Sequence, residues 1–275
     1  MKIERIIEEL AEVTPENVQS MSREEALKNM TKWGKKLTLG MLPTGLLLLA
    51  ASPKAKAGSL GSTAVADVLN FALRLEYLEA AYYRMGVQSA GLIPSADLPI
   101  FQQILKHENA HVTLLNTAIS AIPGATPVAS DRFDFTGGHS AAGTGPYQPF
   151  LATNYSTFLA ISQGLEDTGV RAYKGQAGNF GTNYDTLTVA LQIHSVEARH
   201  AAEVRRLRGE KGWITGNSTT IPSAFAAIYA GEENTTQGGV NATTTTTVGV
   251  DAVTEAFDEP LDMATVLAIA GTFIY

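Results

Sequence analysis

Apolar side chains recur at the spacing of an α-helix along most of the chain after residue 62. This pattern predicts four long helices, over residues 62–86, 95–122, about 147–178 and 184–209. Short connections join the first helix to the second and the third to the fourth. A stretch rich in Gly, Pro and Ser, residues 124–150, separates the second and third helices and predicts a long loop. We therefore expect an all-α fold, a four-helix bundle with one long crossover connection.

The N-terminal residues 1–57 have the pattern of a leader. A polar stretch ends in three lysines, and an apolar run over residues 37–51 and a segment rich in small residues follow it. This order is typical of an export signal, here with a cleavage site after Ala57, so we expect export to the periplasm or the cell surface. The alternative is an N-terminal membrane anchor or a structural helix, although about 15 residues are fewer than the roughly 20 that a spanning helix needs.

The C-terminal residues 213–275 form an extension to the expected bundle of residues 58–212. They contain a low-complexity segment, "ENTTQGGVNATTTTTVG", that predicts a flexible linker. The final segment, "AFDEPLDMATVLAIAGTFIY", places Pro260 near the start of a short apolar helix. This helix is too short to span a membrane, and we expect it to pack on the bundle.

Six ionisable residues lie on the apolar stripes of the four expected helices, where they would face the bundle core. They are Glu76, Glu108, His111, Glu166, Glu197 and His200. The second and fourth helices each carry a Glu-x-x-His motif, whose two side chains lie on nearly one face of a helix. The first and third helices each carry a lone glutamate. Glu76 precedes Glu108 by 32 residues and Glu166 precedes Glu197 by 31, so the bundle reads as two similar helix pairs.

Free carboxylates are expensive to bury, and four of them cannot share a dry core unpaired. Two divalent cations would balance the four negative charges, and two neutral histidines would complete the ligand shells. Oxygen-rich sites with one imidazole per ion suit iron or manganese, and the sequence contains no cysteine that would offer a thiolate. Two Glu helices and two Glu-x-x-His helices are also the known ligand pattern of di-iron carboxylate bundles. The six residues therefore predict a centre of two Fe or Mn ions.

Residues 62–212 resemble the ferritin-like superfamily, which includes ferritins, bacterioferritins, rubrerythrins and manganese catalases. The similarity is carried by "LEYLEAAYY", "HENAH", "LEDTGVRAY" and "VEARH". It is strongest to the exported ferritin-like domain proteins, the group that includes desiccation-related proteins. The C-terminal segment "AFDEPL" also resembles the tail of that group. The resemblance implies a di-metal centre that reacts with dioxygen or peroxide, in the manner of a ferroxidase, peroxidase or catalase. It also implies catalytic roles for the four glutamates, with Glu108 bridging the ions and each histidine a terminal ligand of one.

Two further acidic residues compete for the lone-glutamate positions. Glu79 is a rival of Glu76, but the corresponding position of the third helix is Gly169, so the symmetric choice is Glu76. Asp167 competes with Glu166, and the position seven residues before a tyrosine favours Glu166. The alternative to a metal centre is a hydrogen-bonded polar core that has kept these residues without an ion.

The tyrosines Tyr83 and Tyr173 each follow a lone glutamate by two helical turns. They are either ordinary core tyrosines or groups that support the centre, as hydrogen-bond donors to metal-binding carboxylates or as redox-active side chains. Among the other histidines, we expect His107 on the surface and His139 exposed in the crossover loop. His194 has two readings, a surface position or a position next to the metal ligands.

These observations leave more than one class of function open. The first is a redox enzyme with a di-metal centre, and the second is a non-enzymatic stress or surface protein whose metal is structural. Iron storage ranks last because the long loop and the C-terminal extension would hinder packing into a hollow shell. The net charge of −7 argues against a nucleic-acid partner. The sequence does not define the oligomeric state, and a dimer is compatible with it.

Overall fold

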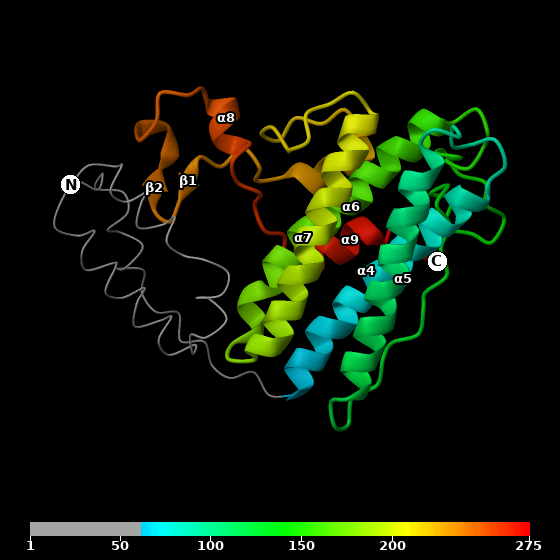
Figure 1. Cartoon of the computed structure of the whole chain (residues 1–275), viewed down its shortest axis with the longest axis horizontal. Coiled ribbons are helices and arrows are strands. Elements are labelled where there is room, and N and C mark those ends of the chain that lie inside the picture. The colour runs from blue at the N-terminus through cyan, green and yellow to red at the C-terminus, as the bar shows by residue number, and fades with distance from the viewer. Residues whose placement is uncertain (1–61) are drawn as a thin grey trace, which may run out of the picture. The chain divides into compact units, whose positions relative to one another are not determined.

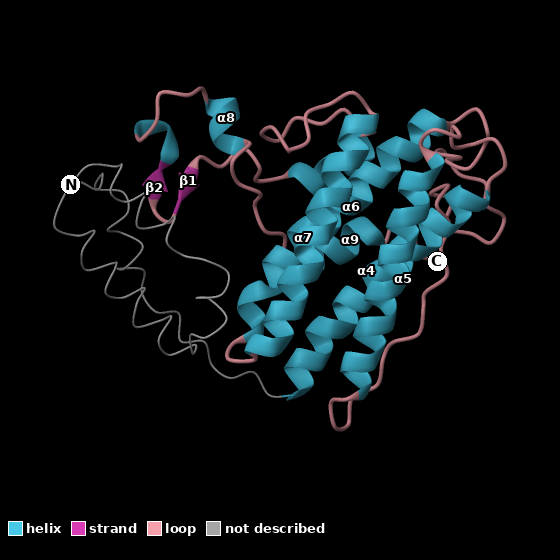
Figure 2. Ribbon diagram, viewed as in Figure 1, coloured by secondary structure: helices cyan, strands magenta, loops and turns pink. Residues whose placement is uncertain are grey.

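The computed structural model describes residues 62–275. The expected export signal, with its apolar run over residues 37–51, lies outside the described residues. The four long helices are α4 (Ser62–Gln88), α5 (Leu98–Ser120), α6 (Tyr155–Ala177) and α7 (Tyr184–Leu207), as Figure 1 shows. α4 packs chiefly on α5 and α6 chiefly on α7, and contacts between α4 and α6 join the two pairs. The predicted all-α fold with a four-helix bundle is confirmed (Figure 2).

The start of α6 differs from the prediction by about two turns. The pattern placed it near Tyr147, whereas the helix begins at Tyr155. Gln148 has a φ of 43°, in the left-handed region, and Pro149 follows it. A helix cannot run through a left-handed residue, so α6 cannot start at Tyr147, and residues 147–154 belong to the crossover loop. The first helical bond of α6 joins the N–H of Phe158 to the carbonyl of Asn154, at 2.9 Å.

Residues 213–275 contain more structure than the expected linker. They form the 3₁₀ helices η4 (Ser223–Tyr229) and η5 (Ala242–Thr244), the strands β1 (Thr236–Gln237) and β2 (Val240–Asn241), and the helices α8 (Val250–Thr254) and α9 (Met263–Ala270). Gly238 and Gly239 connect the two strands with φ angles of 58° and 83°, the conformation that a two-residue hairpin turn requires. The low-complexity segment therefore contains a hairpin turn at Gly238 and Gly239.

The C-terminal extension completes the core of the bundle. α9 packs against both α4 and α6, as its apolar pattern predicted, and its Val266 is fully buried. The chain end also pairs with the crossover loop, since the N–H of Asp134 donates to the carbonyl of Phe273 at 2.8 Å. None of the helices within residues 62–275 is both long and apolar enough to cross a membrane.

A buried cation fixes the extension to α6. Arg171 has no exposed surface, and its Nε lies 2.8 Å from a carboxylate oxygen of Glu232. The guanidinium also donates to the backbone carbonyls of Ile228, Ala230 and Glu259. A charge buried to this degree is stable only when it is paired and hydrogen-bonded, so the extension supplies what Arg171 requires.

The apolar core has two parts along the bundle axis. On α5, Phe101 and Ile104 belong to one cluster of buried side chains, whereas Leu115 and Ile119 belong to the other. The turn of α5 between the two clusters carries Glu108 and His111. The site therefore lies between two apolar layers.

Candidate metal centre

The six predicted residues come together inside the bundle. They form two overlapping groups, in which one ligand atom of each residue lies within 4.8 Å of those of the others. The first group is Glu76, Glu108, His111 and Glu197, and the second is Glu108, Glu166, Glu197 and His200. Every member is at most 8% exposed. Glu108 and Glu197 belong to both groups, whereas each lone glutamate and each histidine belongs to one.

Each of the two histidine nitrogens lies close to more carboxylate oxygens than it can hydrogen-bond. Nδ1 of His111 lies 3.1 Å from Glu76, 3.2 Å from Glu108 and 3.2 Å from Glu197. One imidazole nitrogen carries at most one proton to donate. Nδ1 of His200 lies 2.9 Å from Oε1 of Glu108, but the pair lacks hydrogen-bond geometry. The atoms are thus close together without being paired.

Several buried polar atoms of this cluster have no hydrogen-bond partner within the described part of the chain. They are Glu108 Oε1, Glu166 Oε2, both carboxylate oxygens of Glu197, and His200 Nδ1. Buried polar atoms without a partner are rare and costly in folded proteins. Carboxylate oxygens together with imidazole nitrogens are the ligands of iron and manganese. The donor set therefore fits a metal centre.

The comparison with known families agrees with this geometry. The model of a family described as a ferritin-like domain matches residues 64–210, more than half of the chain. The chain belongs to the ferritin-like family. The match spans nearly all of the four long helices and all six residues of the two groups. No curated protein matches the chain.

Without a bound metal, raised pKa values keep several residues of this ferritin-like cluster protonated. Burial raises the pKa of Glu76 to about 7, and burial with the charge of Glu108 raises the pKa of Glu197 well above its usual range. Burial lowers the pKa of His111, but the hydrogen bond with Glu108 and the close carboxylates of Glu197 and Glu76 outweigh it and raise the pKa to about 12. The pKa of His200 is likewise raised, to about 11, because the charge of a nearby carboxylate outweighs burial. Metal ions must displace these protons to bind.

The metal-free protein is expected to lose stability as the pH rises from about 5 to about 8. Glu76 and Glu197 keep their protons in the folded state at pH values where the unfolded chain, with pKa near 4.5, has released them. Their contribution to stability is complete below pH 4.5 and is lost as the pH rises through the folded-state pKa. Thermal melts of metal-free and Mn²⁺-loaded protein across this range would test this. The gain from Mn²⁺ should grow with pH, and an equal gain at every pH would contradict the assignment.

The two tyrosines join the halves of the bundle at the lone glutamates. The hydroxyl of Tyr83 on α4 donates to Glu166 on α6, and the hydroxyl of Tyr173 on α6 donates to Glu76 on α4. Both tyrosines are buried. Of the two interpretations, this geometry supports donors that orient the carboxylates.

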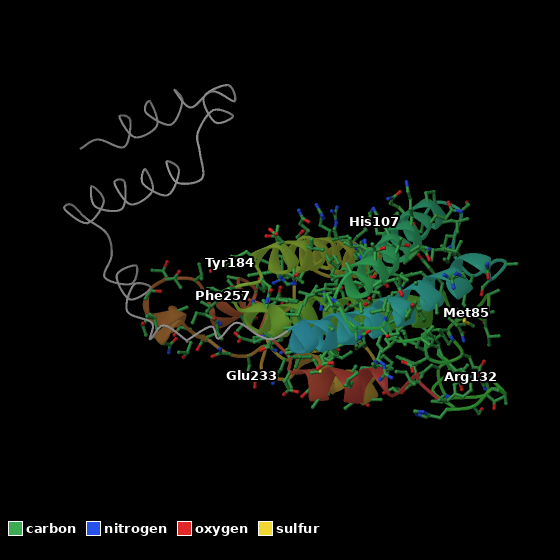
Figure 3. All side chains as sticks on the ribbon, turned by 90° about the horizontal axis from the view of Figure 1, so that it is seen from below. Met85, His107, Arg132, Tyr184, Glu233 and Phe257 are labelled. Carbon is green, nitrogen blue, oxygen red and sulfur yellow. The ribbon has the colours of Figure 1, made fainter. Side chains whose placement is uncertain are left out.

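His107 is only partly exposed, and its contact with His200 was not expected. It is half-buried, and its Nδ1 lies 2.9 Å from Nε2 of His200, with the two rings stacked at a centroid distance of 5.2 Å. Figure 3 shows His107 on α5, beside α7. Its place depends on how closely α5 and α7 approach each other, which the sequence of α5 alone does not show. His107 therefore contacts Nε2 of the proposed ligand His200, the ring nitrogen that faces away from the carboxylates. Contacts of this kind commonly orient a metal-binding histidine.

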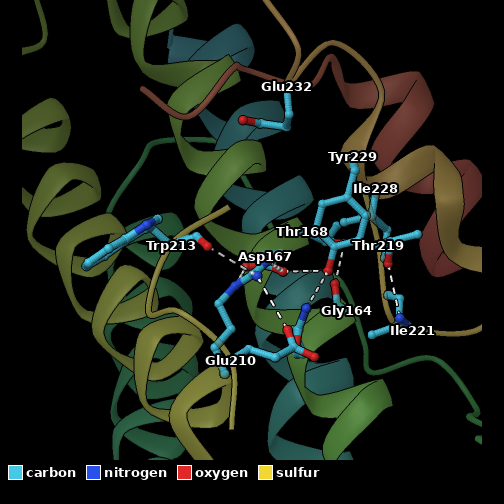
Figure 4. Close-up of polar contacts among 12 residues, drawn as sticks. Gly164, Asp167, Thr168, Glu210, Trp213, Thr219, Ile221, Ile228, Tyr229 and Glu232 are labelled. Carbon is cyan, nitrogen blue, oxygen red and sulfur yellow. Dashed lines mark hydrogen bonds and ion pairs between the residues drawn. The ribbon is translucent and has the colours of Figure 1, made fainter. Parts of the chain in front are cut away.

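The other candidates lie outside the two groups. Asp167 is buried, but it binds Arg205 and accepts a hydrogen bond of 2.6 Å from Tyr229 in a separate network (Figure 4). His194 is half-buried against the backbone of Val170 on α6, and none of the six residues is among the groups that influence its pKa. His139 is exposed, as expected. Glu79 is buried and belongs to neither group.

Proposed function

We propose that the protein is a di-metal oxidoreductase that binds two iron or manganese ions and reacts with dioxygen or peroxide. The observation that carries the proposal is the sharing of Glu108 and Glu197 between the two groups of ligands. Two shared carboxylates would hold two ions a few ångströms apart, the spacing at which two metals act together. The bound ions would supply the electron transfer to or from the oxidant.

The role of each residue follows from the group of ligand atoms to which it belongs. Glu76 and His111 would bind one ion, and Glu166 and His200 would bind the other, each pair completing the shared carboxylates. The hydroxyls that hydrogen-bond Glu76 and Glu166 restrict the rotation of these carboxylates and so fix the direction of their oxygens. Burial excludes bulk water, which strengthens every electrostatic interaction within the site.

A cavity beside the centre supports access by a small oxidant. It has a volume of about 210 Å³ and is lined mostly by apolar side chains, among them Ala72, Leu115 and Ala190. Tyr173 forms part of the lining, and its hydroxyl contacts Glu76. An apolar cavity of about 150 Å³ admits benzene, so dioxygen, which is smaller and apolar, would fit. Export, proposed from residues 1–57, would place the reaction outside the cytoplasm.

Ferrous iron added to the metal-free protein in air is expected to oxidise at least about tenfold faster than in buffer, because paired ions deliver two electrons to one oxygen molecule. The appearance of ferric iron is followed by its absorbance, and peroxide replaces air in a second series. The control is the double variant Glu76→Ala/Glu166→Ala, which lacks one terminal carboxylate at each ion. If wild-type protein binds iron but oxidises it no faster than this variant, the alternative holds: a non-enzymatic stress or surface protein with a structural metal.

A further inference from the structure

A fifth glutamate lies at the centre without a described partner. Glu79 follows Glu76 by one helical turn on α4 and is 3% exposed. Within residues 62–275 it forms no ion pair and no hydrogen bond, and the charged groups that act on it most strongly are the glutamates of the two groups. A buried carboxylate surrounded by other carboxylates is unfavourable unless it takes up a proton or a cation joins them.

The internal repeat of the bundle gives Glu79 an unequal counterpart. Glu76 corresponds to Glu166 and Tyr83 to Tyr173, each 90 residues apart, so Glu79 corresponds to Gly169. A Cβ atom at Gly169 would lie 3.2 Å from Oε1 of Glu79 and 3.2 Å from Oε2 of Glu197. The two carboxylates therefore both border the position that a side chain at residue 169 would occupy. At this level of the bundle α4 carries the Glu79 carboxylate, and Gly169 on α6 has no side chain that would fill the same space.

The position of Glu79 favours one of the two groups. Its carboxylate, like that of Glu197, lies next to Gly169 on α6, the helix that also carries Glu166. Glu197 and Glu166 are, in this order, the charges that act on it most strongly. Both belong to the group of His200, whereas Glu166 is absent from the group of His111.

We propose that Glu79 is an additional carboxylate ligand of the ion held by Glu166 and His200. The ion held by Glu76 and His111 has no such ligand, so the two ions are inequivalent. This inference rests on the proposed function. A further negative charge beside one ion strengthens its binding and stabilises its higher oxidation state, because the attraction grows with the charge of the ion.

The test uses the full chain loaded with Mn²⁺ and the variant Glu79→Gln, which keeps the size of the side chain and removes its charge. Competition with a chelator measures the affinity of each ion. Wild-type protein should bind two ions, and Glu79→Gln should bind one of them at least about tenfold more weakly. Glu203→Gln, at a half-buried position of α7 outside both groups, removes the same charge and should leave both affinities unchanged. Circular dichroism confirms the fold of each variant.

Two histidine variants, used as backgrounds, identify the ion concerned. In a His200→Ala background, where that ion is already weakened, Glu79→Gln should have little further effect, whereas in a His111→Ala background the loss should remain. Gly169→Ala should reproduce the loss, because its methyl group would lie 3.2 Å from both oxygens. In iron-loaded protein, Glu79→Gln should raise the midpoint potential, by about 59 mV for a tenfold change in relative affinity.

The outcomes separate this inference from the proposed function. If Glu79→Gln and Gly169→Ala bind both ions as tightly as the wild type and keep its potential, Glu79 is not a ligand, and the di-metal proposal stands. If the folded wild-type protein binds no ion, both are overturned. If Glu79→Gln weakens the ion of His111 instead, the assignment to Glu166 and His200 is wrong.

Discussion

Replacing Glu108 with alanine is expected to abolish the binding of both metal ions, whereas replacing His111 should weaken only one. Glu108 belongs to both groups of ligand atoms, and His111 belongs to one. Loss of a shared carboxylate removes a ligand from each ion and one negative charge from between two cations, so neither ion remains well held. Elemental analysis after metal loading and gel filtration should show a metal content that falls from about two ions per chain to near zero in Glu108→Ala and to about one in His111→Ala.

The internal repeat supplies a second, independent version of this comparison. Glu197→Ala should behave as Glu108→Ala, and His200→Ala as His111→Ala, because their places in the two groups are equivalent. Each variant requires an unchanged helical circular dichroism spectrum, which separates loss of a ligand from loss of the fold. Equal and small effects of all four substitutions would show that the roles of shared and terminal ligands are wrongly assigned.

The clustering of the six residues was predictable from sequence because two independent patterns meet in it. Helical periodicity places the side chains on core-facing stripes, and burial of charge without a partner is too costly to be accidental. The repeat then selects among rivals: it favours Glu76 over Glu79, and the structure includes Glu76 in a group. The same symmetry argument passes over Glu79, because the corresponding residue of the other helix pair is Gly169 and not a carboxylate.

Features that depend on contacts between helices were beyond this reasoning. His107 is adjacent to Glu108 in sequence and so points away from the stripe of α5, yet α7 lies close enough for it to reach His200. The start of α6 depends on the left-handed Gln148, a conformation that the local sequence does not require. In both cases tertiary packing decides the outcome, and periodicity along one segment does not report it.

The C-terminal extension shows the same limit. Arg171 lies on α6, but the partners of its guanidinium lie 57–88 residues further along the chain. Composition separated residues 213–275 from the bundle, whereas buried charge and apolar packing join the two. A change in composition along a chain is therefore weak evidence for a change of core.

Replacing Glu232 with alanine is expected to lower the free energy of unfolding by about 3–5 kcal/mol, because it leaves a buried cation without its partner. Arg171 is fully buried, and its only carboxylate within 4.0 Å among the described residues is that of Glu232. Burial raises the pKa of Glu232 to about 7, so denaturant unfolding should be measured at about pH 8, where the carboxylate is ionised. The same side chain also accepts the N–H of Glu259 at 2.9 Å, so the substitution releases a second contact of the extension.

Neighbouring variants distinguish loss of the ion pair from general damage to this segment. Glu233 is adjacent and exposed, and Glu233→Ala should change the free energy of unfolding by less than about 0.5 kcal/mol. The double variant Arg171→Met/Glu232→Leu replaces the pair with apolar side chains and should recover only part of the loss. An apolar pair needs no charge compensation, but three backbone carbonyls lose their donor. If Glu232→Ala is as mild as Glu233→Ala, the carbonyls of the extension alone satisfy Arg171. The extension would then be held by apolar packing, and the buried ion pair would contribute little.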